Sequence, residues 1–207
     1  MSDLKTTSDP SAFAVGGMRG HIFRRVIHVG MSVLPYVYFH FGDDIAAGLA
    51  ATKSQVIAAV VSLALLADII RLRFGVAVFG QRSYERGQLS ALAWGTFSIG
   101  LVFLLVPTKA YAWPLILTLS LGDPFLGELR RAGVASRSVF YWGCLLTTAI
   151  WVACSYVFSA PLWLGLLLGP ISVAAEWPRL KYVDDNATMV LIPLGLIVLL
   201  EPFLKIM

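Results

Sequence analysis

Ionisable residues form four groups in this sequence, and each group stands beside a long apolar segment. The groups are His21, Arg24, Arg25 and His28; Asp68, Arg71, Arg82, Glu85 and Arg86; Asp123; and Glu176, Asp184 and Asp185, which the neutral Asn186 follows. Ionisable side chains at or inside a membrane boundary are costly and usually functional. Arginines that share a face with carboxylates suit metal-assisted phosphoryl transfer, because Mg²⁺ and cationic side chains neutralise the phosphate charge.

The first group lies on one face of a predicted helix. Spacings of three, four and seven residues place its four side chains together where the chain enters its first apolar segment. Arg24 and Arg25 would form either a basic collar at the membrane surface or part of an anion site. His28 lies deeper, where it would either satisfy a carbonyl of the core or join that anion site.

The second group is divided between the end of one apolar segment and the start of the next. Asp68 and Arg71 are one helical turn apart, which is consistent with a simple ion pair or with a functional pair at the membrane boundary. Arg82 and Glu85 are predicted to be structural partners, unless they brace a ligand-binding loop.

Asp123 closes an apolar segment and precedes Pro124. Asp before Pro favours a helix start, so Asp123 is a predicted N-cap, and Gly133 would end the short surface helix that follows. The alternative is that the Asp123 carboxylate lies at the mouth of a membrane cavity and binds Mg²⁺.

The fourth group offers more oxygen donors than helix capping requires. One of Asp184, Asp185 and Asn186 would cap the last apolar helix, where the helix dipole favours an acid. Three consecutive oxygen donors also suit a hard divalent cation. Glu176 ends an apolar segment, where a carboxylate is costly and therefore indicates a function. Helix amino termini near Asp123 and Asn186 could add amide donors for phosphate.

The composition predicts an all-α, polytopic membrane helix bundle. Of 207 residues, 58% are hydrophobic and 14% charged, against about 25% charged in soluble domains, and the mean hydropathy is +0.79. Seven apolar segments are candidate crossings, where a crossing needs roughly 20 apolar residues and shorter runs can serve when buried or tilted. They lie near 26–41, 54–72, 89–107, 110–122, 139–158, 161–176 and 187–206. The fourth and sixth are short, so six or eight crossings are alternatives.

Basic residues alternate between the two sides of this predicted bundle. One set of loops carries little beyond Lys53 and Lys109, whereas the other set is rich in arginine. Its members are Arg19, Arg24 and Arg25; Arg71, Arg73, Arg82 and Arg86; Arg130, Arg131 and Arg137; and Arg179 with Lys181. The positive-inside rule therefore predicts a cytoplasmic amino terminus in a prokaryotic cytoplasmic membrane or its equivalent. We expect a flexible cytoplasmic tail over 1–18 and one transmembrane domain over 19–207.

Motifs of soluble nucleotide-binding enzymes are missing from the sequence. Residues 48–54 read GLAATKS, which ends like a P-loop but lacks the glycine before Lys53. No G-x-G-x-x-G, H-E-x-x-H or G-x-S-x-G motif occurs, and Cys144 and Cys154 lie in an apolar run typical of packing residues. No basic stripe with interleaved aromatic residues occurs, so no nucleic-acid partner is expected.

In their order along the chain, the four groups resemble the polyprenol kinase family. This family comprises dolichol kinases, phytol kinases and CTP-dependent diacylglycerol kinases, and is distantly related to CDP-diacylglycerol synthases. The matching segments are Arg24-Arg25-Val26-Ile27-His28; Arg82-Ser83-Tyr84-Glu85, followed by a small-residue segment; Gly122-Asp123 with Gly127; and Glu176 with Asp184-Asp185-Asn186. The resemblance covers almost the whole chain beyond the tail.

The resemblance implies transfer of the terminal phosphate of CTP to a lipid alcohol, with Mg²⁺ or another divalent cation. The acceptor would be a polyprenol, a phytol-like alcohol or a diacylglycerol, and a homodimer is compatible with the pattern. The implied residues are Asp123, Glu85 and Arg82 in catalysis; Asp123, Asp184, Asp185 and Glu176 at the metal; and Arg24, Arg25, His28, Arg71, Arg137 and Asn186 at the nucleotide phosphates.

The stretch after Asp123 departs from the family pattern. Where the family has a lysine-containing Lys-Ser/Thr…Gly stretch, this chain reads GELRRAGVASRSVFYWG, with Arg137-Ser138 and Gly143 as a degenerate counterpart. The alternatives are a CTP-dependent cytidylyltransferase that makes a CDP-lipid, a non-catalytic lipid- or nucleotide-binding membrane protein, or a small transporter. A transporter would carry ionisable groups near the bilayer midplane, whereas these gather at one face.

Overall fold

The computed structural model describes residues 13–106, 108–178, 180 and 182–204. Over these residues the protein is all-α, as predicted. Its helices are α1 (Gly17–Gly30), α2 (Leu34–Gly48), α3 (Lys53–Arg73), α4 (Ala91–Leu105), α5 (Lys109–Leu117), α6 (Asp123–Arg131), α7 (Ser136–Phe158), α8 (Leu162–Glu176) and α9 (Asp185–Leu204). Two 3₁₀ turns, η3 (Met31–Val33) and η4 (Ser83–Gly87), and one π turn, η5 (Thr118–Gly122), accompany them. Residues 1–12 of the predicted tail, and Arg179 and Lys181, lie outside the described residues.

The predicted apolar segments coincide with helices, but two helices are longer than expected. The first segment lies within α1, η3 and α2, which follow one another without a break. The fourth, 110–122, is α5 with η5, and it continues directly into α6. Asp123 has helical backbone angles (φ −59°, ψ −48°), so its predicted role as an N-cap is wrong. Gly133, with φ +74°, lies just beyond the end of α6, as predicted.

Pro124 explains why the helix widens instead of starting at Asp123. Proline has no N–H to donate to the carbonyl of Ser120, and its ring crowds that carbonyl in a regular α-helix. The π turn η5 immediately precedes Pro124 and supplies the wider spacing. The chain therefore passes the proline without ending the helix, and Asp123 is buried in the middle of a long rod.

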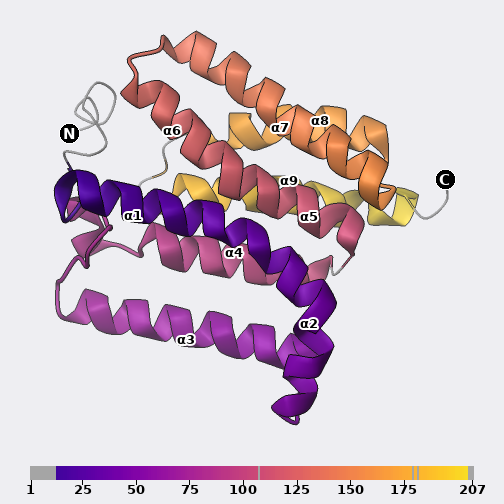
Figure 1. Cartoon of the computed structure of the whole chain (residues 1–207), viewed down its shortest axis with the longest axis horizontal. Coiled ribbons are helices and arrows are strands. Elements are labelled where there is room, and N and C mark those ends of the chain that lie inside the picture. Colours follow the sequence, from indigo (N-terminus) through magenta and orange to yellow (C-terminus); the bar gives the residue numbers. More distant parts are fainter. Residues whose placement is uncertain (1–12, 107, 179, 181, 205–207) are drawn as a thin grey trace.

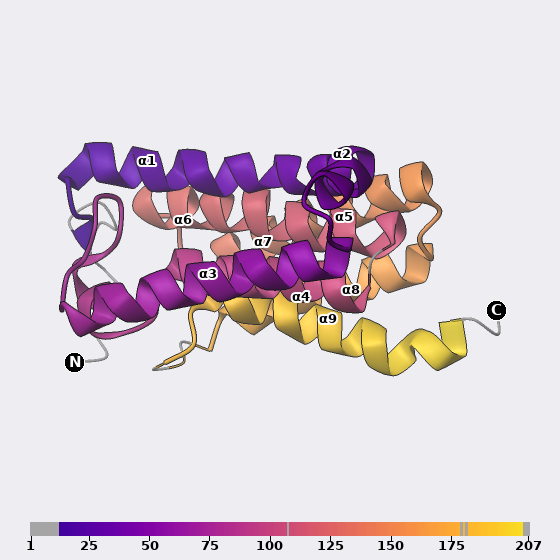
Figure 2. The same ribbon diagram turned by 90° about the horizontal axis from the view of Figure 1, so that it is seen from below.

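The helices form a bundle with two distinct ends (Figures 1 and 2). One end carries the start of α1, the 74–90 connection with η4, and the α6–α7 turn, and the α8–α9 connection turns back toward it. Every arginine of the described residues lies in α1, in the 74–90 connection, or in the turns of α3, α6 and α7 at this end, so we call it the arginine end. The α2–α3, α4–α5 and α7–α8 turns lie at the other end, with Lys53 and Lys109.

Length and composition mark two helices, α3 and α7, as able to cross a membrane. Their most apolar windows have mean hydropathies of 2.0 and 1.4, and the 21 residues of α3 extend about 30 Å, the thickness of the hydrocarbon core. The apolar helices α4, α8 and α9 are shorter. Two such helices are weak evidence of a membrane protein, and the seven crossings stay a prediction.

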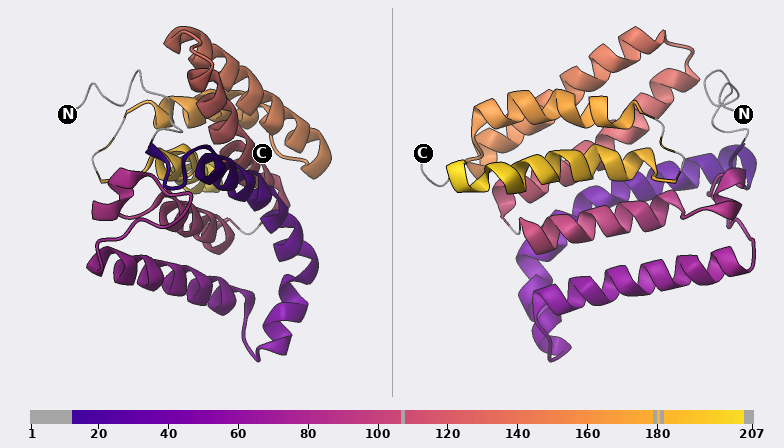
Figure 3. Two further views of the ribbon diagram at one scale, coloured as in Figure 1. Left: turned by 60° about the vertical axis from the view of Figure 1, so that its left-hand side comes forward. Right: turned by 180° about the vertical axis from the view of Figure 1, so that it is seen from behind.

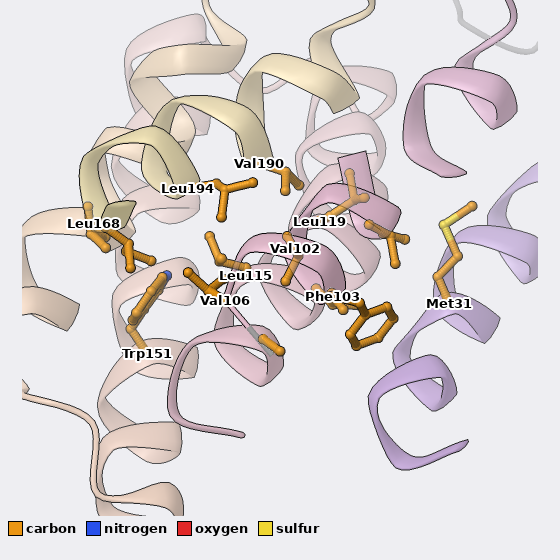
Figure 4. Packing of buried hydrophobic residues seen from close by; sticks show 14 of the residues in the cluster. Met31, Val102, Phe103, Val106, Leu115, Leu119, Trp151, Leu168, Val190 and Leu194 are labelled. Carbon is orange, nitrogen blue, oxygen red and sulfur yellow. The ribbon is translucent and has the colours of Figure 1, made fainter. Parts of the chain in front are cut away.

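The core lies where α4, α5, α7, α8 and α9 meet, and α3 stands outside it against α4 (Figures 1 and 3). Figure 4 shows Leu115, Trp151 and Val190 converging from three helices in this core. Gly169 brings α8 close to α7, since a Cβ there would lie 2.7 Å from the backbone nitrogen of Thr148. Close approach through small residues is typical of helices that pack in membranes.

Candidate functional site

Helix α1 turns the predicted face of basic and histidine side chains into the bundle. His21 and His28 are 5% and 3% exposed, and the side chains of Arg24 and Arg25 are 11% and 13% exposed, which favours the anion-site alternative over a surface collar. Arg24 Nη1 donates to Glu85 Oε1 at 2.7 Å, and Arg25 Nη1 donates to Asp123 Oδ2 at 3.0 Å. His28 Nδ1 lies 3.3 Å from the same Asp123 oxygen. The first, second and third sequence groups therefore meet at the arginine end.

Gly127 and Glu128 of α6 complete the surroundings of Arg25. A Cβ at Gly127 would collide with the Arg25 guanidinium, so only glycine lets this side chain pass to Asp123. Glu128 contacts His21 Nε2 at 3.0 Å and Arg25 Nε at 3.4 Å. Burial raises the pKa of Glu128, but the hydrogen bonds with His21 and Arg131, with the charges of Arg131 and Arg25, lower it below its ordinary value.

Glu85 fixes η4 between α1 and α4. It is 1% exposed; its Oε1 accepts the backbone N–H of Arg82 at 3.0 Å and its Oε2 accepts that of Ala91 at 3.1 Å. The expected partnership of Arg82 and Glu85 is thus made through the Arg82 backbone. The Arg82 guanidinium itself donates to the Tyr84 hydroxyl. Glu85 therefore anchors η4 to the start of α4 and accepts the hydrogen bond of Arg24.

Asp68 and Arg71 form the predicted ion pair, with Arg71 Nε donating to Asp68 Oδ1 at 2.6 Å. The other N–H groups of Arg71 donate to Asp68 Oδ2 and to the carbonyls of Val76, Glu85 and Gln88. A guanidinium has five N–H donors, and all five are used within the protein. Asp68 also accepts the Ser90 N–H at 2.8 Å. Arg71, which the resemblance implies at phosphate, holds the 74–90 connection here.

The residues before α9 lie close to the same arginines. Asp184 Oδ1 accepts the backbone N–H of Asn186 at 3.1 Å, so Asp184 caps the helix as one of the three was predicted to do. Burial and the neighbouring Asp185 carboxylate raise the pKa of Asp184 well above its ordinary value, against the opposing charges of Arg24 and Arg82. Burial lowers the pKa of Arg82, but Tyr84, Asp185 and Asp184 together raise it above its ordinary value.

Asn186 is buried at 1% exposure, and neither its Oδ1 nor its Nδ2 has a hydrogen-bond partner among the described residues. A buried amide without partners costs about 1–3 kcal/mol for each unsatisfied group. It lies directly after two carboxylates that face Arg24 and Arg82. Its unused donor and acceptor are therefore available to a polar ligand at the arginine end.

Glu176 has a partner that the sequence analysis did not assign. Arg130 Nη1 donates to Glu176 Oε1 at 2.6 Å, and the Arg130 guanidinium also stands 5.5 Å from the Trp177 ring centre. Glu176 Oε2 is buried and has no partner in the described part of the chain. Burial lowers the pKa of Arg130, but Glu176, Asp185 and Asp123 raise it. Arg130 thus electrostatically links α6, α8 and the start of α9.

The predicted metal ligands do not form one closed protein site. Among the described residues, no group of three or more His, Cys, Asp or Glu side chains could hold a metal ion. Asp123 is engaged by Arg25 and His28, whereas Asp184 and Asp185 stand beside the unpaired Asn186 amide. This oxygen set fits Mg²⁺, which takes one or two carboxylates and completes its shell with water and phosphate oxygens.

Arg137 lies elsewhere, exposed in the first turn of α7. It lines a separate open pocket with Phe140 and Trp177, and no described residue forms an ion pair with it. Of the implied phosphate ligands, Arg137 is thus the one that the described structure neither brings to the other groups nor joins to them by hydrogen bonds. Glu128 and Arg130, which were not predicted from the sequence, do form ion pairs with residues of these groups.

Comparisons with protein-family models, with curated proteins and with solved structures found no match to this chain.

Proposed function

We propose that this protein is an integral membrane lipid-alcohol kinase that transfers the γ-phosphate of CTP to a polyprenol, a phytol-like alcohol or a diacylglycerol. The observation that carries the proposal is that Arg24, Arg25 and Arg82 lie at one end of the bundle, where Arg25 pairs with Asp123 and the charges of Arg24 and Arg82 act on Asp184. These residues come from four separate segments. Their juxtaposition suits a site for a phosphate chain and a cation.

Phosphate recognition would fall to the arginines and to the start of α9. Arg24 and Arg25 of α1 both contact carboxylates in this structure, Arg24 that of Glu85 and Arg25 that of Asp123. A triphosphate offers several anionic oxygens, and guanidinium groups bind such oxygens through paired N–H donors. The unpaired Asn186 amide and the amino terminus of α9 would add neutral donors.

Asp184 and Asp185, with the Asn186 oxygen, are the residues that would hold Mg²⁺. When bound, the cation supplies charge neutralisation to the β- and γ-phosphates. Burial already disfavours a charged Asp184. A cation bound by Asp184 and Asp185 would offset this burial cost and the repulsion between the two carboxylates, in addition to the charges of Arg24 and Arg82.

The transfer itself breaks the bond between the γ-phosphorus and the β–γ bridging oxygen and forms a bond from the alcohol oxygen to that phosphorus. CDP leaves with the electron pair, and the proton of the alcohol goes to a carboxylate. We assign Asp123 as this acceptor, because the hydrogen bond from Arg25 at 3.0 Å orients its carboxylate, which remains 8% exposed.

The apolar surface supports a lipid acceptor. Large apolar side chains of α3, among them Leu63, Leu66 and Ile69, are more than half exposed, which suits contact with acyl chains rather than water. The positive-inside rule then puts the arginine end at the cytoplasmic face. A nucleotide would reach the site from water and a long-chain alcohol from the bilayer, so the site stands at the boundary that both substrates share.

The test is transfer of radiolabelled γ-phosphate from CTP to each of the three alcohols by purified protein with Mg²⁺. Asp123→Asn should abolish transfer, whereas Asp43→Asn, at the opposite end and paired with Lys53, should retain it. Release of CDP identifies a kinase, and release of pyrophosphate identifies a cytidylyltransferase instead. Binding of nucleotide with no turnover on any alcohol would favour a non-catalytic role.

A further inference from the structure

An open pocket of about 480 Å³ lies between the first turns of α7 and the end of α8, outside the site described above. This volume falls within the range of small-ligand sites. Its walls combine one cation with aromatic rings and small groups. The lining residues are Ser136, Arg137, Phe140, Tyr141, Ala174 and Trp177.

The aromatic side chains that line this pocket pack against one another. Phe140 and Trp177 meet edge to face with ring centres 5.3 Å apart, and Arg130 holds the Trp177 ring at 5.5 Å. Tyr141 is 71% exposed and lies at the arginine end of an exposed apolar stripe of α7 that continues through Leu145. Tyrosine and tryptophan gather at membrane–water interfaces, where their rings lie at the level of lipid headgroups.

Among the residues that the structure describes, Arg137 is the only charged one in the lining. It is exposed, it has no ion-pair partner in the part of the chain that the structure describes, and it precedes Tyr141 by one helical turn. Ser136 adds a hydroxyl beside it, and both stand in the first turn of a 23-residue helix whose dipole favours an anion there. The polar part of the pocket therefore selects an anion and the apolar part selects an acyl chain.

We propose that this pocket binds the phosphate headgroup of an anionic membrane phospholipid, with Arg137 and Ser136 on the phosphate and one acyl chain along the Tyr141–Leu145 stripe of α7. The inference rests on the membrane location in the proposed function, but not on kinase activity. It gives Arg137 a ligand of its own, separate from the nucleotide phosphates. The occupant is a lipid rather than a soluble phosphate because the ring wall continues into the exposed apolar face.

The experiment incorporates the full chain into nanodiscs of phosphatidylcholine with phosphatidylglycerol and counts retained phosphatidylglycerol by native mass spectrometry. The Arg137→Gln variant should retain one phosphatidylglycerol molecule fewer than the wild type. The affinity of the pocket for that molecule should fall about tenfold, as expected for the loss of one charge-assisted hydrogen bond. Ala174→Leu, which fills the pocket without changing charge, should match Arg137→Gln. The matched control is Arg73→Gln, an exposed arginine of the same end outside the pocket.

Unchanged retention in Arg137→Gln, or an equal loss in Arg73→Gln, would overturn the proposed lipid site. Displacement of the retained lipid by glycerol 3-phosphate at millimolar concentration would also overturn it, since the pocket would then take a soluble phosphate. Failure of the wild-type chain to enter nanodiscs would overturn the membrane location and this inference together. Entry with unchanged lipid retention would overturn this inference alone and leave the proposed kinase untouched.

Discussion

Replacement of Gly127 by alanine should disturb the geometry of the site while leaving the stability of the fold almost unchanged. A Cβ at this position would occupy the space of the Arg25 guanidinium. The flexible arginine can move aside, but it then loses its contacts with Asp123 at 3.0 Å and Glu128 at 3.4 Å. We therefore expect a large loss of transfer activity with only a small loss of stability.

The magnitude follows from two opposing contributions. A charge-assisted hydrogen bond contributes about 1.5–3 kcal/mol, whereas replacing glycine by alanine inside a helix stabilises by about 1 kcal/mol. The difference is a destabilisation of about 0.5–2 kcal/mol. For a chain of 207 residues this lowers Tm by about 2–6 °C, at roughly 3 °C for each kcal/mol. Thermal unfolding of the purified protein, followed by circular dichroism, measures it.

Two further variants decide whether the effect passes through Arg25. Gly195→Ala in α9 meets no atom within 4 Å, so it should raise Tm by about 2–4 °C through helix propensity alone. In an Arg25→Gln background, Gly127→Ala should cost no stability, because the displaced contacts are already lost. An equal drop in Tm in the wild-type and Arg25→Gln backgrounds would refute this account of Gly127.

Three other predictions concern the support of the site. Arg71→Gln removes a guanidinium whose five donors are all used, and should destabilise the protein by about 3–5 kcal/mol, with faster proteolysis within residues 74–90 as the readout. The pKa of Asp184 is raised in the folded state above its ordinary value of 3.8. The contribution of this carboxyl to the stability of the protein is therefore most favourable below pH 3.8 and is lost as the pH rises through the raised pKa. Asp184→Asn should therefore exceed the wild type in Tm by a margin that grows from acid to neutral pH, and Mg²⁺ should narrow that margin; a constant margin would contradict the assignment. Gly169→Ala forces a Cβ against the backbone of Thr148 and should cost about 1–3 kcal/mol in denaturant unfolding, where an unchanged midpoint would argue against close α7–α8 packing.

The helices could be predicted well from the sequence, because each apolar run begins and ends close to where its helix begins and ends. The segment 54–72 is α3 almost residue for residue, and 161–176 is α8 within one residue. The shared face of α1 was also foreseeable, since spacings of three and four are a property of any α-helix. What the spacing could not show was the direction of that face, which only the burial of His21 and His28 reveals.

Partners far apart in the chain could not be predicted from local pattern. Glu128 and Arg130 were missed because Asp123 was expected to begin a surface helix, and a surface helix places such residues in water. Arg130 lies seven residues after Asp123, which is the same face of a helix that continues through Pro124. The role of Arg71 in holding the 74–90 connection could not be predicted for another reason: the carbonyls that accept from it belong to an irregular connection with no sequence signature.

The π turn between α5 and α6 decides how this rod responds to the gain or loss of a residue on either side of Pro124. A π turn holds one residue more than an α-helical turn, so it accommodates an insertion while the flanking segments keep their orientation. Loss of one residue within Thr118–Gly122 would return this stretch to α-helical pitch and press the Pro124 ring against the carbonyl four residues before it, so the rod would kink next to Asp123. Loss of one residue between Pro124 and Arg130 would instead rotate the remainder of α6 by about 100°, and would carry Arg130 away from Glu176.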